Sequence, residues 1–275
     1  MQEEVLSLIK DNLGFNDILL ETSLYKVELL SYYNYFLYDN FIPLDLKDKI
    51  KEEYLDNIFF TNLTEEKVIF ISDTHIGSRN ENIDYLNQVN QFIKENDVSY
   101  LFHGGDLGDG MVNYHKKYGT YSMQIDHLVD VYYDLFDLKQ YILGGNHDYR
   151  YKRKGIDILR LLAGNSLIES VGYYGAYFKV FDKVISFEHN SRKRNNLISS
   201  DFRILGHAHI CNFKDRSMTL PASCDEFTNN SLNFNPGFIT LESNKIDDEV
   251  ELKFLEYVYT YNGPKSFKVK KYMLK

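Results

Sequence analysis

Five short polar clusters, each placed directly after an apolar run, hold the residues best suited to chemistry. They combine carboxylate, amide and imidazole groups, and they contain five of the eight histidines. These groups are good ligands for divalent first-row metals, and a donor set without thiolates fits Mn²⁺, Fe or Zn²⁺. The clusters, in chain order, are Asp73-Thr74-His75, Gly105-Asp106-Leu107-Gly108-Asp109, Gly145-Asn146-His147-Asp148, Glu188-His189-Asn190 and Gly206-His207-Ala208-His209.

Each cluster by itself is compatible with a polar turn at the end of a strand. The run Val68–Ile71 is apolar enough for a strand buried on both faces, and Asp73 and His75 follow it closely. Alternation along an extended chain also places His207 and His209 on one face. The repetition of this arrangement at five strand ends favours a shared metal site over five unrelated turns.

Strands and helices alternate in the part of the chain that carries the first three clusters. This order predicts a parallel sheet with right-handed crossovers, in which ligands sit outside the carboxyl ends of the strands. The first three clusters fall at such ends. The strands are predicted at 68–71, 100–102 and 141–143, and the amphipathic helices at about 82–95 and 122–136.

After Leu161 the pattern changes to short strands joined by turns, which predicts a second, largely antiparallel sheet. Residues 1–60 show helical spacing of their apolar residues. We therefore expect an α/β fold, an αββα sandwich of two central mixed sheets flanked by helices over residues 63–275, with an N-terminal helical segment at 1–62. The strands of the second sheet are predicted at 176–181, 184–187, 203–205, 218–220, 237–241 and 249–259.

The five clusters, in this order, resemble the motifs of the calcineurin-like metallophosphoesterase superfamily: D-x-H, G-D-x-x-D, G-N-H-D/E, a lone His, and G-H-x-H. The resemblance runs from about residue 67 to 210 and implies a site for two divalent metal ions, with Mn²⁺ favoured and Fe or Zn²⁺ as alternatives. It implies that Asp106 bridges the two metals. The first metal would be held by Asp73, His75, Asp106 and His209, and the second by Asp106, Asn146, His189 and His207.

The surrounding residues are similar to a bacterial and phage branch of the superfamily. The segment from Ser72 to Ser78 also resembles the small subunit of archaeal replicative DNA polymerases and, more loosely, the nuclease of the recombination-repair complex. The stretches similar to the bacterial and phage branch are Phe70–His75, Asp106–Gly110 and Gly155–Ile158.

The resemblance also implies catalytic roles for two residues beside the ligands. Two cations roughly 3.5–4 Å apart would neutralise phosphate charge and lower the pKa of a bridging water. His147 would donate a proton or a hydrogen bond to the leaving oxygen. Asp109 would orient His147 and raise its pKa, and Asp148 is a second candidate for that role.

The substrate is indicated by one departure from the family pattern and by two basic runs. Gly110 stands where the protein-phosphatase branch has arginine, which disfavours a Ser/Thr protein phosphatase. Basic residues follow the clusters at Asp148 and His189, and this placement suits an anionic substrate larger than one phosphate. A solvated basic surface is an equal alternative. The candidate substrate-binding residues are Arg150, Arg153, Arg192 and Arg194.

The expected function is hydrolysis of a phosphodiester in nucleic acid or a nucleotide. One alternative is a phosphomonoesterase acting on a protein or a small molecule. Another is a non-catalytic phosphoesterase-like subunit of a replication or repair complex. Lost ligands would mark such a subunit, and the sequence retains every one.

Charge and composition limit the partners and the cellular location that we expect for this chain. The formal net charge is −9, and residues 1–62 carry −7 of it, with 12 acidic residues against 5 lysines. An acidic segment is poorly suited to binding a nucleic-acid backbone. The alternatives for these helices are a lid, a dimer contact or a docking site for a protein partner. With no apolar run of bilayer length, no signal-peptide pattern and no C-x-x-C, we expect a cytoplasmic protein without membrane association.

Overall fold

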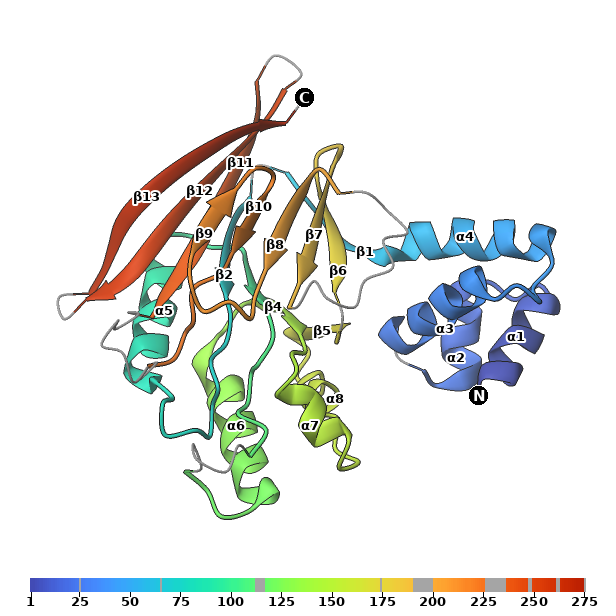
Figure 1. Ribbon diagram of the computed structural model, residues 1–275, viewed down its shortest axis with the longest axis horizontal. Helices are drawn as coiled ribbons and strands as arrows, with labels where there is room; N and C mark the ends of the chain where they lie inside the picture. Colours follow the sequence, from blue (N-terminus) through green and yellow to red (C-terminus); the bar gives the residue numbers. More distant parts are fainter. Residues whose placement is uncertain are drawn as a thin grey trace. The chain divides into compact units, whose positions relative to one another are not determined.

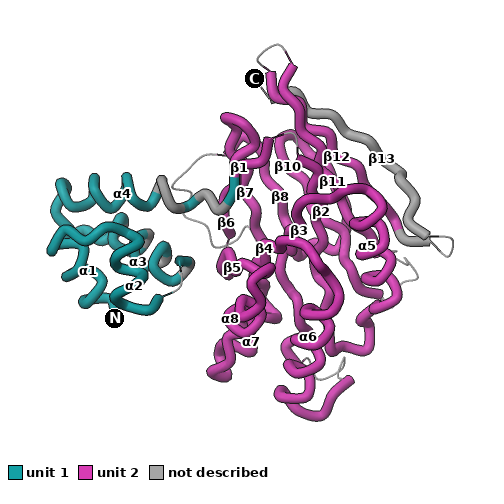
Figure 2. The backbone as a smooth tube through the Cα atoms, turned by 180° about the vertical axis from the view of Figure 1, so that it is seen from behind, with its two compact units in different colours: residues 1–61 teal, residues 62–275 magenta. Residues whose placement is uncertain are grey.

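The computed structural model describes residues 1–24, 26–64, 66–111, 117–173, 175–189, 200–225, 236–246, 249–260 and 263–274. The chain divides into two units, Met1–Thr61 and Asn62–Lys275, each described here by itself (Figure 2). Within the described ranges, no helix has both the length and the hydropathy that a membrane span requires.

The first unit is helical, as expected for the N-terminal segment. Val5 and Ile9, one turn apart on the first helix, are both buried. The rings of Phe15 and Tyr33 pack edge to face with centroids 5.3 Å apart, and the Tyr33 hydroxyl donates to Glu53 Oε2 at 2.5 Å. These contacts hold its last three helices together. The helices are α1 (Gln2–Lys10), α2 (Phe15–Thr22), α3 (Lys26–Tyr38) and α4 (Leu44–Ile58).

The second unit is built on two mixed sheets, which confirms the predicted α/β sandwich (Figure 1). A seven-stranded sheet has the order β13-β12-β11-β2-β3-β4-β5, and a six-stranded sheet has the order β1-β6-β7-β8-β10-β9. The strands are β1 (Phe59–Leu63), β2 (Lys67–Ile71), β3 (Tyr100–His103), β4 (Lys139–Leu143), β5 (Ile168–Gly172), β6 (Ala176–Val180), β7 (Lys183–Glu188), β8 (Phe202–Leu205), β9 (Asn212–Lys214), β10 (Ser217–Thr219), β11 (Gly237–Ile246), β12 (Glu249–Thr260) and β13 (Gly263–Leu274).

Strands β2, β3, β4 and β5 are parallel, as the alternation of strands and helices predicts. The apolar stripes of the connecting helices pack with Ile69 and Ile71 of β2 in one buried core. Asn82 and Thr120 cap the two longer helices by accepting from the backbone N–H groups of Tyr85 and Met123. The helices are α5 (Ile83–Glu95), α6 (Tyr121–Leu135), α7 (Asp148–Lys152) and α8 (Ile158–Leu162).

The prediction of a second, largely antiparallel sheet is wrong in two respects. Strand β11 pairs antiparallel with β2, so β11 and β12 extend the first sheet instead of joining the second. The six-stranded sheet is also less antiparallel than the strand pattern predicts, because β7 and β8 are parallel and β8 and β10 are parallel. That both sheets are mixed agrees with the predicted sandwich. Strand periodicity predicts which residues form strands, but it does not predict which sheet edge a strand pairs with. Here β11 pairs with the edge of β2 that the parallel strands leave unpaired.

Four phenylalanine rings join the two sheets face to face. Phe70 and Phe102 project from β2 and β3, and Phe178 and Phe187 project from β6 and β7; all four are fully buried. The ring centroids of Phe70 and Phe102 lie 5.0 Å apart, and those of Phe102 and Phe178 also lie 5.0 Å apart. Such pairs add about 0.5–1.5 kcal/mol each beyond the area that they bury.

Replacing Phe102 by alanine should lower the free energy of unfolding by about 3–5 kcal/mol, because it empties the centre of this aromatic cluster. Urea unfolding followed by circular dichroism measures the change. The control Met123→Ala removes a side chain that is 52% exposed on α6, and it should change stability by less than about 0.5 kcal/mol. Equal losses for the two variants would contradict the importance assigned to the cluster.

Candidate metal centre

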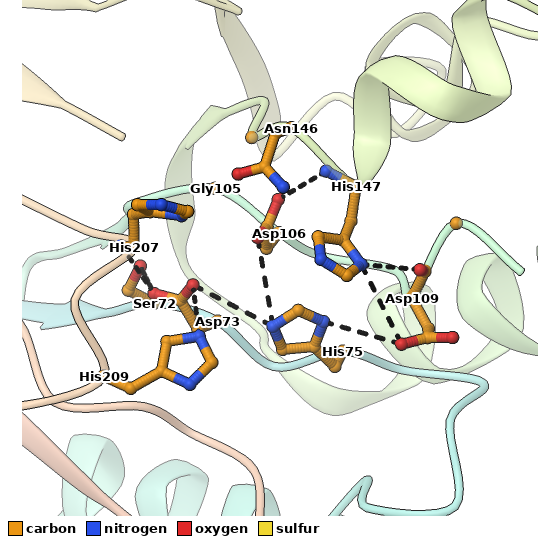
Figure 3. A network of polar contacts seen from close by, with 12 residues as sticks. Ser72, Asp73, His75, Gly105, Asp106, Asp109, Asn146, His147, His207 and His209 are labelled. Atoms are coloured by element: carbon orange, nitrogen blue, oxygen red, sulfur yellow. Dashed lines mark hydrogen bonds and ion pairs between the residues drawn. The ribbon is translucent and has the colours of Figure 1, made fainter. Parts of the chain in front are cut away.

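The five polar clusters converge on one place, although they come from two sheets. Strands β2, β3 and β4 of the seven-stranded sheet and β7 and β8 of the six-stranded sheet each end in one of them. Figure 3 shows the labelled carboxylate and imidazole groups turned toward one another. All seven predicted ligands lie in these loops: Asp73, His75, Asp106, Asn146, His189, His207 and His209.

The backbone bends sharply at most of these ligands. Five of the seven have positive φ angles, in the left-handed region that non-glycine residues rarely adopt. Each such residue costs of order 1–3 kcal/mol, and strain of this kind clusters at functional sites. The loops therefore maintain an unfavourable backbone that turns the side chains inward. The φ angles are 56° at Asp73, 43° at His75, 53° at Asp106, 67° at His207 and 57° at His209.

Two glycines allow the loops to approach one another closely. A Cβ atom on Gly145 would collide with Asp106 Oδ1. Gly105 has a φ of +97°, and a Cβ atom there would lie 2.5 Å from His189 Nδ1. A side chain at either position would displace a predicted ligand.

The first group of ligand atoms lies around the Asp73 carboxylate. His209 Nε2 is 3.1 Å from Asp73 Oδ1, and His75 Nε2 is 3.9 Å from the same oxygen. The other oxygen, Oδ2, accepts from the backbone N–H of His207 at 3.0 Å and from the Ser72 hydroxyl at 2.5 Å. Asp73, His75 and His209 can thus offer one ligand atom each to a single ion.

The second group lies around the Asp106 carboxylate. His189 Nε2 is 3.2 Å from Asp106 Oδ2 and 3.1 Å from Asn146 Oδ1. His189 Nδ1 donates to the carbonyl oxygen of Gly104 at 2.7 Å, which leaves Nε2 as the ligand atom. Asp106, His189 and His207 form a set whose ligand atoms all lie within 4.8 Å of one another.

The side chain of His75 provides a direct test of whether these residues suit metals. Its Nε2 atom is buried and has no hydrogen-bond partner among the described residues. It lies 3.9 Å from Asp73 Oδ1 and also 3.9 Å from Asp106 Oδ2, too far for a hydrogen bond to either. A buried nitrogen left between two carboxylates fits coordination to a cation, and the N/O donor set suits Mn²⁺, Fe or Zn²⁺.

The protonation of the ligands follows from burial and from their neighbours. Burial lowers the pKa of His75 to about 4, so this imidazole is neutral. Burial also acts to lower the pKa of His189, but its hydrogen bond to Asp106 outweighs that effect and raises the pKa to about 9. For Asp73, burial acts to raise the pKa, yet the hydrogen bond with His209 holds the pKa below its usual value.

His147 lies at the edge of the ligand groups, with its ring edge-on to that of His75 at a centroid distance of 4.6 Å. Its Nδ1 atom lies 2.7 Å from the backbone carbonyl oxygen of Asp109, whereas the Asp109 carboxylate is 3.9 Å away. That carboxylate is also 3.8 Å from His75 Nδ1. Because a carbonyl only accepts, His147 Nδ1 carries the proton. The backbone of Asp109, and not its side chain, therefore makes the hydrogen bond that orients His147.

Asp148 ties two ligand loops together and does not contact the His147 ring. Its fully buried carboxylate accepts from the backbone N–H groups of Leu107 at 3.1 Å, Gly108 at 3.0 Å and Gly145 at 2.8 Å. Burial raises the pKa of Asp148 to about 7, and the charge of Asp106 adds to this effect. Sequence reasoning placed Asp148 in the right motif but missed this use of its carboxylate.

His103 is not among the predicted site residues, and the structure shows it fully buried at the end of β3. Its Nδ1 atom accepts from the backbone N–H of Gly105 at 3.2 Å, and Nε2 lies 3.1 Å from Thr74 Oγ1. Both ring nitrogens are therefore occupied by hydrogen bonds that support the loops carrying Asp73 and Asp106. A histidine next to a ligand motif is the only sequence signal for this supporting role.

The candidate substrate-binding arginines are only partly brought to this site. Arg150 is half-buried, and a Cβ atom on Gly110 would lie 2.9 Å from its Cδ atom, so its side chain runs beside the residue that follows Asp109. Arg153 is exposed just beyond the end of α7. Arg192 and Arg194 lie outside the described residues.

Several solved structures are similar to this chain at low sequence identity. Vps29 from Cryptosporidium parvum is 11% identical with a TM-score of 0.47, covering 76% of this chain and 98% of that chain. Vps29 from Entamoeba histolytica in complex with Zn²⁺ is 15% identical with a TM-score of 0.41, covering 76% and 99%. The calcineurin-like phosphoesterase YfkN from Bacillus subtilis is 10% identical with a TM-score of 0.38, covering 76% and 90%.

A comparison with curated proteins finds no match. A family model described as calcineurin-like phosphoesterase matches residues 66–257. This match is more than half of the chain, and it includes all five polar clusters of the metal centre. The chain therefore belongs to the calcineurin-like phosphoesterase family.

Proposed function

We propose that this protein is a metal-dependent phosphodiesterase that acts on nucleic acid or a nucleotide through two divalent cations, with Mn²⁺ favoured. The observation that carries the proposal is the arrangement of two ligand groups with His147 beside them, close enough to His75 and Asp106 for these three residues to form a third candidate group. Asp73, His75 and His209 form one group, and Asp106, His189 and His207 form the other. Asp106 and His75 lie between the groups, with 3.9 Å separating Asp106 Oδ2 from His75 Nε2.

The ligand roles proposed from the family resemblance fit this geometry. Asp73, His75 and His209 would hold one cation together with Asp106, and Asn146 would join Asp106, His189 and His207 around the other. When bound, two such cations offset the negative charge of a phosphate ester and make a water molecule more acidic. Asn146 is a neutral oxygen donor, so its presence keeps positive charge for an anionic substrate.

His147 is the residue proposed to protonate the leaving oxygen. Its Nδ1 proton is directed to the Asp109 carbonyl oxygen, so Nε2 is the nitrogen available to a substrate. The Asp109 carboxylate lies 3.9 Å from His147 Nδ1 and places a negative charge beside the ring. A general acid in this position typically contributes about 10²–10⁴-fold in rate.

Arg150 is proposed to contact a phosphate oxygen of the substrate. Its side chain passes Gly110, whose φ of +64° and close neighbours leave no room for a side chain. The Arg150 side chain therefore runs beside position 110, where the protein-phosphatase branch has arginine. A guanidinium group suits this role, because it donates charge-assisted hydrogen bonds to phosphate oxygens.

The choice of a diester over a monoester is supported by the basic residues after Asp148, which extend beyond a single phosphate. Membership of the bacterial and phage branch, with its likeness to replication and repair phosphoesterases, is part of the same proposal. We assign residues 1–62 to a separate helical segment that suits a protein partner, and residues 63–275 to the phosphoesterase domain. A non-catalytic subunit is disfavoured because every family ligand is retained.

With Mn²⁺ added, the purified protein should hydrolyse bis-p-nitrophenyl phosphate faster than p-nitrophenyl phosphate. The variant Asp106→Ala should lose at least about a hundredfold in kcat and bind less metal, because Asp106 is the ligand proposed to be shared by both cations. Nitrophenolate release and elemental analysis measure the two effects. The control Asp126→Ala removes an exposed carboxylate on α6 and should retain both properties. Normal hydrolysis by Asp106→Ala would refute the site assignment.

Removing the charge of Arg150 should weaken substrate binding more than it slows the chemical step. We expect Arg150→Ala to raise KM for a dinucleotide about tenfold and to change kcat less, because one charge-assisted hydrogen bond is lost. Steady-state kinetics at low ionic strength provide the measurement. The matched control is Arg216→Ala, an exposed arginine in the turn between β9 and β10. An unchanged KM for Arg150→Ala would remove Arg150 from the substrate site.

Metal binding should release about one proton from His189 at about pH 8, because a ligand imidazole must be neutral. Its pKa of about 9 in the metal-free protein means that it starts protonated. Calorimetric titration with Mn²⁺ in buffers of different ionisation enthalpy measures the released proton. The control His127→Gln replaces a histidine of α6 outside the ligand set and should still release the proton. Binding without proton release would argue against His189 as a ligand.

A further inference from the structure

Two fully buried polar side chains outside the ligand set are joined to the loops of the metal centre. Gln124 lies on the buried face of α6, and Tyr151 lies on α7, and both have 0% exposed surface. Leu128 and Leu135 follow Gln124 at helical spacing on that face and are buried as well. An amide among apolar neighbours is stable only when its hydrogen bonds are made, so its partners define its role.

The hydrogen bonds of these two side chains form one continuous chain. The backbone N–H of Gly110 donates to the Tyr151 hydroxyl at 3.0 Å, and that hydroxyl donates to Gln124 Oε1. The same Oε1 atom accepts from the backbone N–H of Met111 at 3.1 Å. Gln124 Nε2 donates to the carbonyl oxygen of Gly77, two residues after the ligand His75, at 2.9 Å. Gln124 makes three of these bonds, and exchanging its amide oxygen and nitrogen would place a donor opposite the Met111 N–H and an acceptor opposite the Gly77 carbonyl.

This chain ends on the peptide group that orients His147. The N–H that Tyr151 binds belongs to Gly110, and the carbonyl of that same planar peptide group belongs to Asp109. The Asp109 carbonyl oxygen lies 2.7 Å from His147 Nδ1. Tyr151 and His147 are one helical turn apart, so α7 holds one peptide plane at both of its ends.

We propose that Tyr151 and Gln124 are positioning residues that fix the 109–110 peptide plane and thereby the orientation and tautomer of His147. The inference rests on the proposed function, because it matters for rate only if His147 protonates the leaving oxygen. Tyr151 holds the plane from the N–H side, and Gln124 anchors Tyr151 to the loop that follows His75. The Gly110 N–H donates to Tyr151, and the Asp109 carbonyl oxygen accepts from His147. Both hydrogen bonds polarise the peptide group between them in the same direction.

The test compares two diesters whose leaving oxygens need a proton to different extents. Bis-p-nitrophenyl phosphate releases a stable phenolate, and diphenyl phosphate releases a more basic one. In the Mn²⁺-loaded protein, Tyr151→Phe should lower kcat for diphenyl phosphate about tenfold more than kcat for bis-p-nitrophenyl phosphate. The reason is that a misplaced His147 would lose part of the rate that it contributes as a general acid. The control Tyr132→Phe removes another buried hydroxyl, 3.1 Å from Thr74 Oγ1, and should leave the ratio of the two rates unchanged.

A second readout needs no turnover. Long-range ¹H–¹⁵N correlation spectra of the metal-free wild-type protein should show His147 protonated at Nδ1, and Tyr151→Phe should convert it to a mixture of tautomers. If Tyr151→Phe does not fold, Gln124→Met, which keeps the length of the side chain but removes the amide, should produce the same two changes.

An equal fall in rate for both diesters, or a neutral wild-type His147 that is protonated at Nε2 and not at Nδ1, would overturn the inference. A wild-type protein that hydrolyses neither diester would overturn the proposed function instead. In that case the tautomer spectra alone decide whether Tyr151 positions His147.

Discussion

Four carboxylates buried in one place are the constraint on which the rest of the second unit depends. Asp73, Asp106, Asp109 and Asp148 are each no more than 1% exposed. Buried charges of one sign are unstable unless cations, hydrogen bonds or protons compensate for them. Backbone N–H groups compensate Asp148, and imidazoles surround the others. The positive-φ loops and the glycines between them make sense as the backbone that brings these groups within reach.

Much of this arrangement is predictable from the sequence because parallel strands present their carboxyl ends at one edge. The apolar runs before Asp73, Asp106 and Asn146 predict three such strands, and the structure places all three side by side. Sheet membership was less predictable. Residues 237–246 have the pattern of a strand, but only the free edge of β2 determines that they pair with it. That edge is a property of the assembled sheet and has no local sequence signal.

Residue types do not reveal whether the backbone or the side chain of a residue makes a given hydrogen bond in the site. Asp109 was expected to orient His147 through its carboxylate, and its carbonyl oxygen lies closer instead. Asp148 was expected near the same ring, and it binds three backbone N–H groups. In both cases loop torsion angles decide which atom faces the partner. Gln124 left a usable signal, since helical spacing places this amide on an apolar face.

The division of the ligands between two sheets has a mechanical consequence. His75 and Asp106 follow strands of the seven-stranded sheet, whereas His189 and His209 follow strands of the six-stranded sheet. Any ion held by Asp106 and His189 together would cross-link the two sheets at this end of the sandwich and oppose their separation. By mass action, the resistance of this fold to heat would then rise with the free concentration of its metal. Catalytic competence and rigidity would be gained in a single binding event.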